Sequence, residues 1–389
     1  MISTSVSAPS TTALPRVLVT LKEDLQNDPE ARVKYGYFLD ALIDRFPFVK
    51  TVNVSLPNVG RMLNTLLMFH PNPRQWNRRR RMNVLAFRER SKRATAQVAR
   101  CRGQIDLILQ IGVRYDARWK DISLPSVIYT DYTSRLSMRK PDSTPLPLVS
   151  SERAKWFALE SGAFERASHI CTRSKFVRAS LIEDYGIQEE KVTAIGGGVN
   201  LRKLPEIDMC RQPGPPTVLF IGKNFYRKGG DLILEAFARV RREMPDARLL
   251  FLCLEPVPSH FSSEGVELIP PTWDRQQISN LYRRADVFVL PSRLETWGDV
   301  LLEAMAHCLP CVGVAGEAME EIVENGVTGI VVGSNSVDEL RDALLTLFKS
   351  GSLRAAMGAA GRKKVEEQFT WHRVVERLSE SMRIVLSSD

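Results

Sequence analysis

Short apolar runs alternate with longer helical stretches along this chain of 389 residues, and the whole alternation occurs twice. The runs are rich in Val, Ile and Leu and are apolar on both faces, which is typical of parallel strands covered by helices on each side. Each series therefore predicts one doubly wound α/β domain. The runs are 16–20, 49–54, 107–110, 126–130, 168–172 and 192–195 in the first series, and 217–222, 248–253, 266–269, 287–290, 311–314 and 329–332 in the second.

A polar, proline-rich stretch over 201–216 separates the two series, as linkers do. We expect an N-terminal Rossmann-like domain over 1–200 and a C-terminal one over 217–369, facing each other across a cleft. A C-terminal helix over 370–389 follows, and its return to the N-terminal domain is one option. Ligands of such sheets bind beyond the carboxyl ends of the strands, so the chemistry is expected in the loops that follow them.

The segment 287–314 contains the strongest candidates for chemistry. A buried strand is followed by a loop that ends at Gly298, and a helix begins at about Asp299. Glycine lets the backbone come close to a ligand, and the unpaired amides of a helix N-terminus form a seat for phosphate. Glu295 lies in the loop, and Glu303 lies just over one turn into the helix.

The two carboxylates need a purpose other than phosphate binding, because they would repel phosphate. An ionised carboxylate only accepts hydrogen bonds, so it suits the paired hydroxyls of a sugar. Charge-assisted bonds of this kind contribute about 1.5–3 kcal/mol each. The segment therefore predicts a ligand that contains both phosphate and sugar, which is a nucleotide sugar.

A second loop supports this interpretation. It follows the strand at 217–222 and contains the cations Lys223, Arg227 and Lys228 before Gly229. Cations at the mouth of a second strand would stabilise the negative charge that grows on a departing diphosphate. The chain contains no Asp-x-Asp pair, so we expect the lysines to serve in place of a metal, and we predict no metal site and no cofactor.

The residues E-T-W-G-D-V-L-L-E at 295–303, followed by A-M-A-H-C-L-P, resemble the Glu-x7-Glu motif of glycosyltransferase family 4, which has the GT-B fold. The resemblance extends over roughly two thirds of the chain and is strongest in the C-terminal half. Its other segments are G-K-N-F-Y-R-K-G-G at 222–230, E-N-G-V-T-G at 324–329, T-R-S-K-F-V-R at 172–178 and G-G-G-V-N at 196–200.

This resemblance implies a retaining hexosyltransferase whose N-terminal domain binds the acceptor and whose C-terminal domain binds the nucleotide sugar. It implies that Glu303 holds the ribose and that Glu295, a catalytic candidate, holds the donor sugar. Lys223 and Lys228 would hold the diphosphate. The backbone around Gly298, Asp299 and Val300 would assist them.

In the N-terminal domain the match to the family is looser. The family often ends a strand there with a histidine near the sugar, whereas this chain has I-Y-T-D-Y-T, which makes Asp131 the second catalytic candidate. Gly36, within Tyr35-Gly36-Tyr37, stands for the early glycine-rich loop of the family and is the acceptor-side or loop candidate. Cys308 replaces a usual glycine after the motif helix, which we interpret as tolerated packing.

The net charge of +9 is concentrated in one segment, because 74–102 contains eleven basic residues and one acidic residue. Beside it, 62–69 forms an apolar helical stripe, and the combination predicts docking onto an anionic membrane. A solvated charged face is the alternative. Many relatives act on lipid-linked acceptors at the cytoplasmic leaflet, which agrees with docking. The membrane-binding candidates are Arg78, Arg79, Arg80 and Arg81.

We therefore expect a UDP- or GDP-linked sugar as the donor and a glycan or lipid-linked molecule as the acceptor. One alternative is a nucleic-acid-binding protein that uses 74–102, although we find no RNA- or DNA-binding motif. Another is a GT-B epimerase or phosphorylase. The sequence shows neither a secretory signal nor eighteen consecutive apolar residues, so we expect a cytoplasmic protein, with a peripheral position at the inner membrane face as an option.

Overall fold

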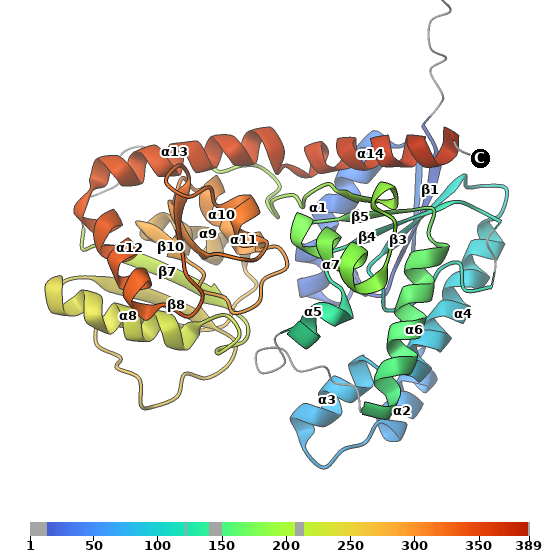
Figure 1. The fold of residues 1–389 in the computed structure, drawn as a ribbon, viewed down its shortest axis with the longest axis horizontal. Helices are drawn as coiled ribbons and strands as arrows, with labels where there is room; N and C mark the ends of the chain where they lie inside the picture. The colour runs from blue at the N-terminus through green and yellow to red at the C-terminus, as the bar shows by residue number, and fades with distance from the viewer. Residues whose placement is uncertain (1–13, 121–122, 140–149, 207–213, 388–389) are drawn as a thin grey trace, which may run out of the picture.

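The computed structural model describes residues 14–120, 123–139, 150–206 and 214–387 and contains two six-stranded parallel sheets, which confirms the expected class. The sheets lie side by side, and each has helices on both faces (Figure 1). The strand orders are β2-β1-β3-β4-β5-β6 and β12-β11-β10-β7-β8-β9. In each sheet the chain first adds strands on one side of the first strand and then crosses to add the remaining strands on its other side. That crossing point is where doubly wound sheets bind ligands.

The N-terminal sheet is built from runs that the sequence predicts to within about two residues. Its first helix, α1, begins at Pro29 because the Asp28 side chain accepts hydrogen bonds from the amides of Glu30 and Ala31. The elements are β1 (Arg16–Leu21), α1 (Pro29–Arg45), β2 (Phe48–Asn53), α2 (Asn58–Leu67), α3 (Pro73–Arg81), α4 (Val84–Cys101), β3 (Leu107–Ile111), β4 (Ser126–Thr130), α5 (Ser134–Arg139), α6 (Ser150–Arg166), β5 (His169–Thr172), α7 (Lys175–Tyr185), η1 (Glu189–Lys191) and β6 (Val192–Ala194).

The C-terminal sheet places β10 between β11 and β7, with Phe288 opposite Cys311 on one side and Leu219 on the other. The loops that follow β7 and β10 are therefore neighbours at one edge of this sheet. The elements are β7 (Thr217–Gly222), α8 (Gly230–Glu243), β8 (Arg248–Cys253), β9 (Val266–Ile269), α9 (Arg275–Arg284), β10 (Val287–Val289), α10 (Asp299–Ala306), β11 (Cys311–Val314), α11 (Met319–Ile322), β12 (Gly329–Val332), α12 (Val337–Lys349), α13 (Gly351–Gln368) and α14 (Trp371–Ser387).

The last helix, α14, packs on the N-terminal domain although it follows the C-terminal one, as Figure 1 shows at the top of the molecule. Trp371, Leu378 and Met382 are buried in the same cluster as Phe38 of α1 and Tyr129 of β4. The ring of Phe38 lies 5.0 Å from that of Trp371 and 5.1 Å from that of Tyr129. The N-terminal core is thus completed by residues from the far end of the chain.

The structure corrects one expectation. Gly36 lies inside α1 and not in a loop, because the capping carboxylate of Asp28 and the proline after it start the helix at Pro29, well before Gly36. Cys308 follows α10 with φ of +56°, a conformation that favours glycine, which agrees with glycine being usual there in the family that the sequence resembles.

Gly229 brings the two loops of the C-terminal edge together. Its φ is +73°, and a Cβ atom added there would lie 2.1 Å from the carbonyl oxygen of Pro291. A side chain at this position would therefore push the loop after β7 away from the loop after β10. The close approach of the two backbones requires glycine, and it places Lys228 beside the loop that contains Glu295.

We predict that Gly229→Ala destabilises the protein by more than the strain of a positive φ alone. Gly316→Ala is the matched control, since Gly316 has φ of +84° but no atom within 4 Å of an added Cβ. We expect a loss of about 1 kcal/mol in the control and at least about 2 kcal/mol in Gly229→Ala, measured by urea unfolding. Equal losses would contradict the proposed contact between the loops.

Candidate active site

Glu295 is buried in the loop after β10, with 7% of its surface exposed, and it forms an ion pair with Lys228. The hydroxyl of Ser292 donates to the same carboxylate at 3.4 Å, and the amide of Glu295 donates to the carboxylate of Glu317. Burial favours the neutral acid, but Lys228 and Arg227 outweigh it, so the pKa of Glu295 lies below its ordinary value. Glu295 is therefore an ionised acceptor held in place by a lysine.

Glu303 is likewise buried, on the first turns of α10, with 4% of its surface exposed. Arg275, the first residue of α9, lies 2.9 Å from one of its carboxylate oxygens, and the Tyr282 hydroxyl donates to the other at 3.2 Å. Burial raises the pKa of Glu303 above its ordinary value, although Arg275 opposes the shift. Two buried carboxylates, each with its own cation, thus lie along one loop and helix.

α10 begins at Asp299, directly after Gly298, as the sequence predicts. Gly298 has φ of +113° and offers no side-chain cap, so no side chain of that residue covers the first amides of the helix. Asp299 is the first helical residue, and Val300 follows it with its carbonyl oxygen accepting from the Tyr282 hydroxyl at 3.3 Å. An uncapped helix start beside Lys228 and Glu295 has the polarity of an anion seat.

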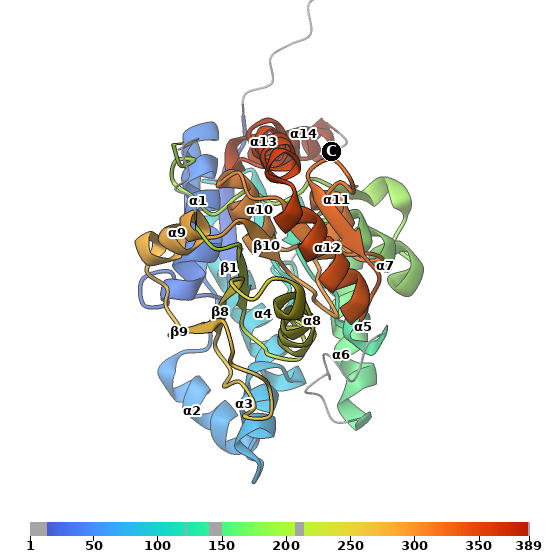
Figure 2. The same ribbon diagram turned by 90° about the vertical axis from the view of Figure 1, so that its left-hand side faces the viewer.

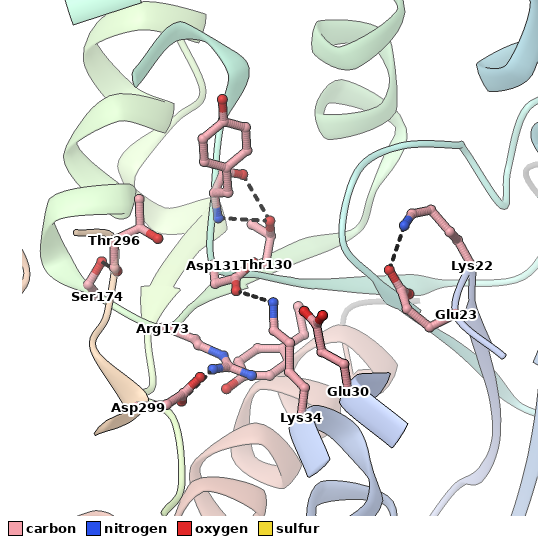
Figure 3. Close-up of polar contacts among 12 residues, drawn as sticks. Lys22, Glu23, Glu30, Lys34, Thr130, Asp131, Arg173, Ser174, Thr296 and Asp299 are labelled. Carbon is pink, nitrogen blue, oxygen red and sulfur yellow. Dashed lines mark hydrogen bonds and ion pairs between the residues drawn. The ribbon is translucent and has the colours of Figure 1, made fainter. Parts of the chain in front are cut away.

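Arg173 joins this helix start to the N-terminal domain. Its guanidinium is 2% exposed, donates to the carboxylate of Asp299 at 2.9 Å, and lies over the rings of Tyr129 and Trp371. Figure 3 shows Arg173 reaching from the N-terminal domain toward Asp299, close to Asp131. A second link runs beside it, since the Ser174 hydroxyl donates to the carbonyl of Thr296 at 2.9 Å.

Asp131 follows β4, as the sequence predicts, and its carboxylate pairs with Lys34 of α1 at 2.7 Å (Figure 3). Burial opposes both charges, but the pair and the nearby Arg173 outweigh it. The pKa of Asp131 therefore lies well below its ordinary value, and that of Lys34 lies above its own. Lys34 and Arg173 therefore favour the ionised form of the Asp131 carboxyl over the protonated one.

The structure separates the two lysines that the sequence assigns to one diphosphate. Lys228 lies beside Glu295, whereas Lys223 forms an ion pair with Glu30 of α1, across the two domains, and lies 4.9 Å from the centre of the Trp273 ring. The Lys223 and Glu30 side chains are 40% and 50% exposed, so this pair is weak and exchangeable.

A cavity of about 670 Å³ opens at the carboxyl edge of the N-terminal sheet. Its wall includes Lys34, Asp131 and Glu160 of the N-terminal domain, and it reaches the C-terminal domain at Thr296, next to Glu295. Gly36 is not part of this wall. The cavity thus lies between the N-terminal catalytic candidate and the loop that contains the C-terminal one.

Several site residues cannot be predicted from the sequence, because their contacts join distant segments of the chain. Arg173 and Arg275 belong to this group, together with Lys34, Tyr282 and Glu317. Arg173 nevertheless has a sequence signal, since it lies in T-R-S-K-F-V-R. Arg227, one of the three predicted loop cations, lies close enough to Glu295 to lower the pKa of that carboxyl.

Residues 211–364 match the family model described as glycosyl transferases group 1. Residues 211–364, which make up most of the C-terminal domain, are therefore similar to the glycosyl transferases group 1 family. The group 1 match contains Lys228, Glu295 and Glu303 and ends within α13, so it covers the whole carboxyl edge described above.

One curated relative of this group 1 domain is the GDP-mannose-dependent monoacylated alpha-(1-6)-phosphatidylinositol monomannoside mannosyltransferase of Corynebacterium glutamicum. It is 34% identical over 167 residues, which are 39% of this chain and 43% of the relative. The chain spans about half the length of the first curated relatives that it matches.

Some solved structures match nearly the whole chain in fold. Sucrose-phosphate synthase from Thermosynechococcus elongatus superposes with a TM-score of 0.70 at 16% identity, covering 96% of this chain and all of that one. HepE of Anabaena, solved in complex with UDP and glucose, gives 0.60 at 14% identity and covers 95% and 99%. The predicted GT-B fold is thereby confirmed.

Within the described residues, no three His, Cys, Asp or Glu side chains form a group that could hold a metal ion. None of the helices in those ranges combines the length and the apolar character needed to cross a bilayer.

Glu160, in the cavity wall, gives a test of the site's electrostatics. It is 1% exposed, and it accepts hydrogen bonds from the hydroxyls of Ser134, at 2.9 Å, and Tyr185. Burial raises its pKa to about 7 from an ordinary value of 4.5. Between these values the folded state holds a proton that the unfolded chain releases, so this group's contribution to stability falls as pH rises.

We predict that Glu160→Gln gains stability relative to the wild type, by about 3 kcal/mol, as pH rises from 4.5 to 7. The reason is that the glutamine side chain does not ionise in this pH range. Urea unfolding at a series of pH values measures the difference. Glu165→Gln, on the exposed side of the same helix, is the control. If the two variants gave parallel curves, the buried position of the Glu160 carboxyl would not be the cause.

Proposed function

We propose that this protein is a retaining glycosyltransferase that moves a hexose from a nucleotide diphosphate sugar to an acceptor without a metal ion. The observation that carries the proposal is the pair of buried carboxylates, Glu295 and Glu303, beside Lys228 and the uncapped start of α10. Nucleotide sugars contain the hydroxyls and the diphosphate that this combination is suited to bind. The UDP and the GDP-mannose named for two similar proteins support a donor of this class.

Each group has one part in the proposed mechanism. Glu303 would accept hydrogen bonds from the ribose, and Glu295 would accept them from the donor sugar. Lys228 and the amides around Gly298–Val300 would stabilise the charge on the departing diphosphate. Lys223 would exchange its solvent-exposed partner Glu30 for the diphosphate when the donor enters.

Asp131 would act as a fixed negative charge. Glycosyl transfer passes through a transition state in which the sugar becomes positively charged. A carboxylate that stays ionised beside the cavity stabilises such a charge, and Lys34 and Arg173 keep it ionised and oriented. Lys34 would therefore be a positioning residue, with no contact to the reacting atoms.

We predict that Glu303→Gln lowers the affinity for the donor by at least tenfold, because it removes the ionised acceptor of the ribose hydroxyls. A panel of UDP- and GDP-sugars is screened by thermal shift, since a ligand of the folded state raises the melting temperature. Glu367→Gln, at an exposed site on α13, is the control and should respond like the wild type. Slow hydrolysis of the bound donor should release a sugar with the donor's anomeric configuration, as proton NMR would show.

The site assignment would be wrong if wild type and Glu303→Gln were stabilised equally by every nucleotide sugar. An inverted product would leave the donor site in place and overturn the retaining mechanism.

We also propose that α2 and α3 dock the protein on an anionic membrane that presents a lipid-linked acceptor. α2 reverses the usual distribution of side chains in a surface helix. Its buried residue is the polar Asn64, whereas its apolar side chains face solvent. The Asn64 amide donates to the carbonyl of Arg80 at 2.7 Å, and the Trp76 indole donates to that of Thr65 at 2.8 Å, so the two helices form one unit. The apolar residues, 52–74% exposed, are Val59, Met62, Leu63, Leu66, Leu67 and Phe69.

The charge of α3 suits the same partner. Its last turn contains Arg78, Arg79, Arg80 and Arg81, and α2 and α3 project from the lower end of the N-terminal domain in Figure 1. Exposed apolar surface of this extent beside cations is the pattern of a membrane-surface helix.

We predict that the double substitution Leu63→Ser and Leu66→Ser lowers binding to phosphatidylcholine vesicles with about 30% phosphatidylglycerol by at least tenfold. Vesicle flotation measures the bound fraction, and salt should weaken it. Ile384→Ser, at a 60% exposed position on α14, is the matched control. Equal losses in the two variants, or wild-type binding in the double variant, would contradict docking through α2.

A further inference from the structure

Arg90 is a buried cation, and part of its hydrogen-bonding capacity is not used. It lies on α4 in the cavity wall, and 7% of its surface is exposed. Its Nε and Nη1 atoms are buried and have no hydrogen-bond partner. Burial of a guanidinium without acceptors is costly, so a purely structural role leaves this residue unexplained. A ligand in the cavity that supplies the missing acceptors would account for it.

Two further cations face the same part of the cavity. Lys22 follows β1 and Arg114 follows β3, and both line the cavity with Arg90. Burial, and then the like charge of Arg114, lowers the pKa of Arg90 to about 10, against the pull of Glu23. Burial lowers the pKa of Lys22 as well, and Arg114 and Arg90 add to this effect. The three cations are thus close enough to repel one another.

The carboxylates nearby do not balance this charge. Glu23 lies 2.7 Å from Lys22 and is paired with it (Figure 3). Glu160, which the charge of Arg114 also reaches, is neutralised in part, since burial raises its pKa to about 7 and Ser134 and Tyr185 donate to it. An excess of positive charge therefore remains in a concave and partly desolvated site, where it attracts an anion.

The position of the cations fits one end of an elongated ligand. The cavity wall runs from Asp131 and Thr296, where the sugar would be transferred, to Arg61 and Arg81 on the α2–α3 unit. A hydroxyl of the ligand near Asp131 would leave a second group of the same molecule beside Lys22, Arg90 and Arg114.

We propose that this cavity binds the acceptor through a phosphate group, a monoester or a diester, which Arg90 holds together with Arg114 and Lys22. Guanidinium groups suit this task because their planar donors match two phosphate oxygens at once. The identification of the ligand as the acceptor rests on the proposed glycosyltransferase function, whereas the phosphate site itself follows from the residues of the cavity. The phosphate can come from a free phosphorylated molecule or from a lipid headgroup.

The test is a binding titration with saturating UDP or GDP present, so that phosphate does not enter the donor site instead. The probes are glycerol 3-phosphate and dihexanoylphosphatidylglycerol, which present the group on a free molecule and on a soluble lipid. Isothermal titration calorimetry compares the wild type with Arg90→Met. We expect the variant to bind at least one of the two probes at least tenfold more weakly than the wild type.

The melting temperature of the ligand-free variant distinguishes a binding role from a structural one. Because Arg90 has unpaired buried nitrogens, Arg90→Met should melt at the wild-type temperature or above it. Arg100→Met, at an exposed site on the same helix, is the control and should keep wild-type affinity. If Arg90→Met does not fold, Arg114→Gln takes its place in the titration.

The outcomes of the titration distinguish the two sources of the phosphate group and can overturn the proposal. Weaker binding of glycerol 3-phosphate assigns the site to free phosphorylated acceptors, and weaker binding of the lipid alone assigns it to headgroups. Wild-type affinity of both Arg90→Met and Arg114→Gln for both probes would overturn the proposal. If the wild type binds these probes at Arg90 but no nucleotide sugar stabilises it, the proposed function fails while the phosphate site stands.

Discussion

The buried guanidinium of Arg173 is the contact on which the geometry of the site depends. It stands between the two sheets, with Asp299 as its ionic partner and the rings of Tyr129 and Trp371 beneath it. A buried cation without its carboxylate costs several kcal/mol, so the two domains gain by keeping Asp299 in place. Because Asp299 is the first residue of α10, the same contact fixes the direction in which that helix faces the N-terminal domain.

The other charges of the site are also arranged as pairs of opposite sign, and these pairs are buried or half-buried. Lys228 and Glu295, Arg275 and Glu303, and Lys34 and Asp131 each come from different elements. In each pair the partner fixes the orientation of the other side chain and offsets the penalty of burial. A ligand that enters has to replace or supplement these partners, and this favours ligands that contain both hydroxyl groups and phosphate.

The sequence predicts the fold well because both signals involved are local. Apolar runs and helical periodicity locate the strands, and the Glu-x7-Glu spacing with Gly298 locates α10 and its two carboxylates. Gly36 is a helical residue and not a loop residue, because Asp28 caps a helix that begins at Pro29. The partners Arg275 and Lys34 could not be found, since their contacts depend on how distant elements pack. The split between Lys223 and Lys228 has the same cause, because Glu30 lies in the other domain.

The return of α14 to the first sheet makes the N-terminal domain discontinuous in sequence. Trp371 donates from its indole to the Asn200 side chain at 3.1 Å, and Phe369 accepts from the amide of Val199 at 2.7 Å, so the two connections between the domains run side by side. Two adjacent connections restrict relative motion to rotation about the line that they define. Any attempt to produce the first domain alone has to graft residues 371–387 onto it, because cutting at the linker would leave the ring of Phe38 and the apolar face around it open to water.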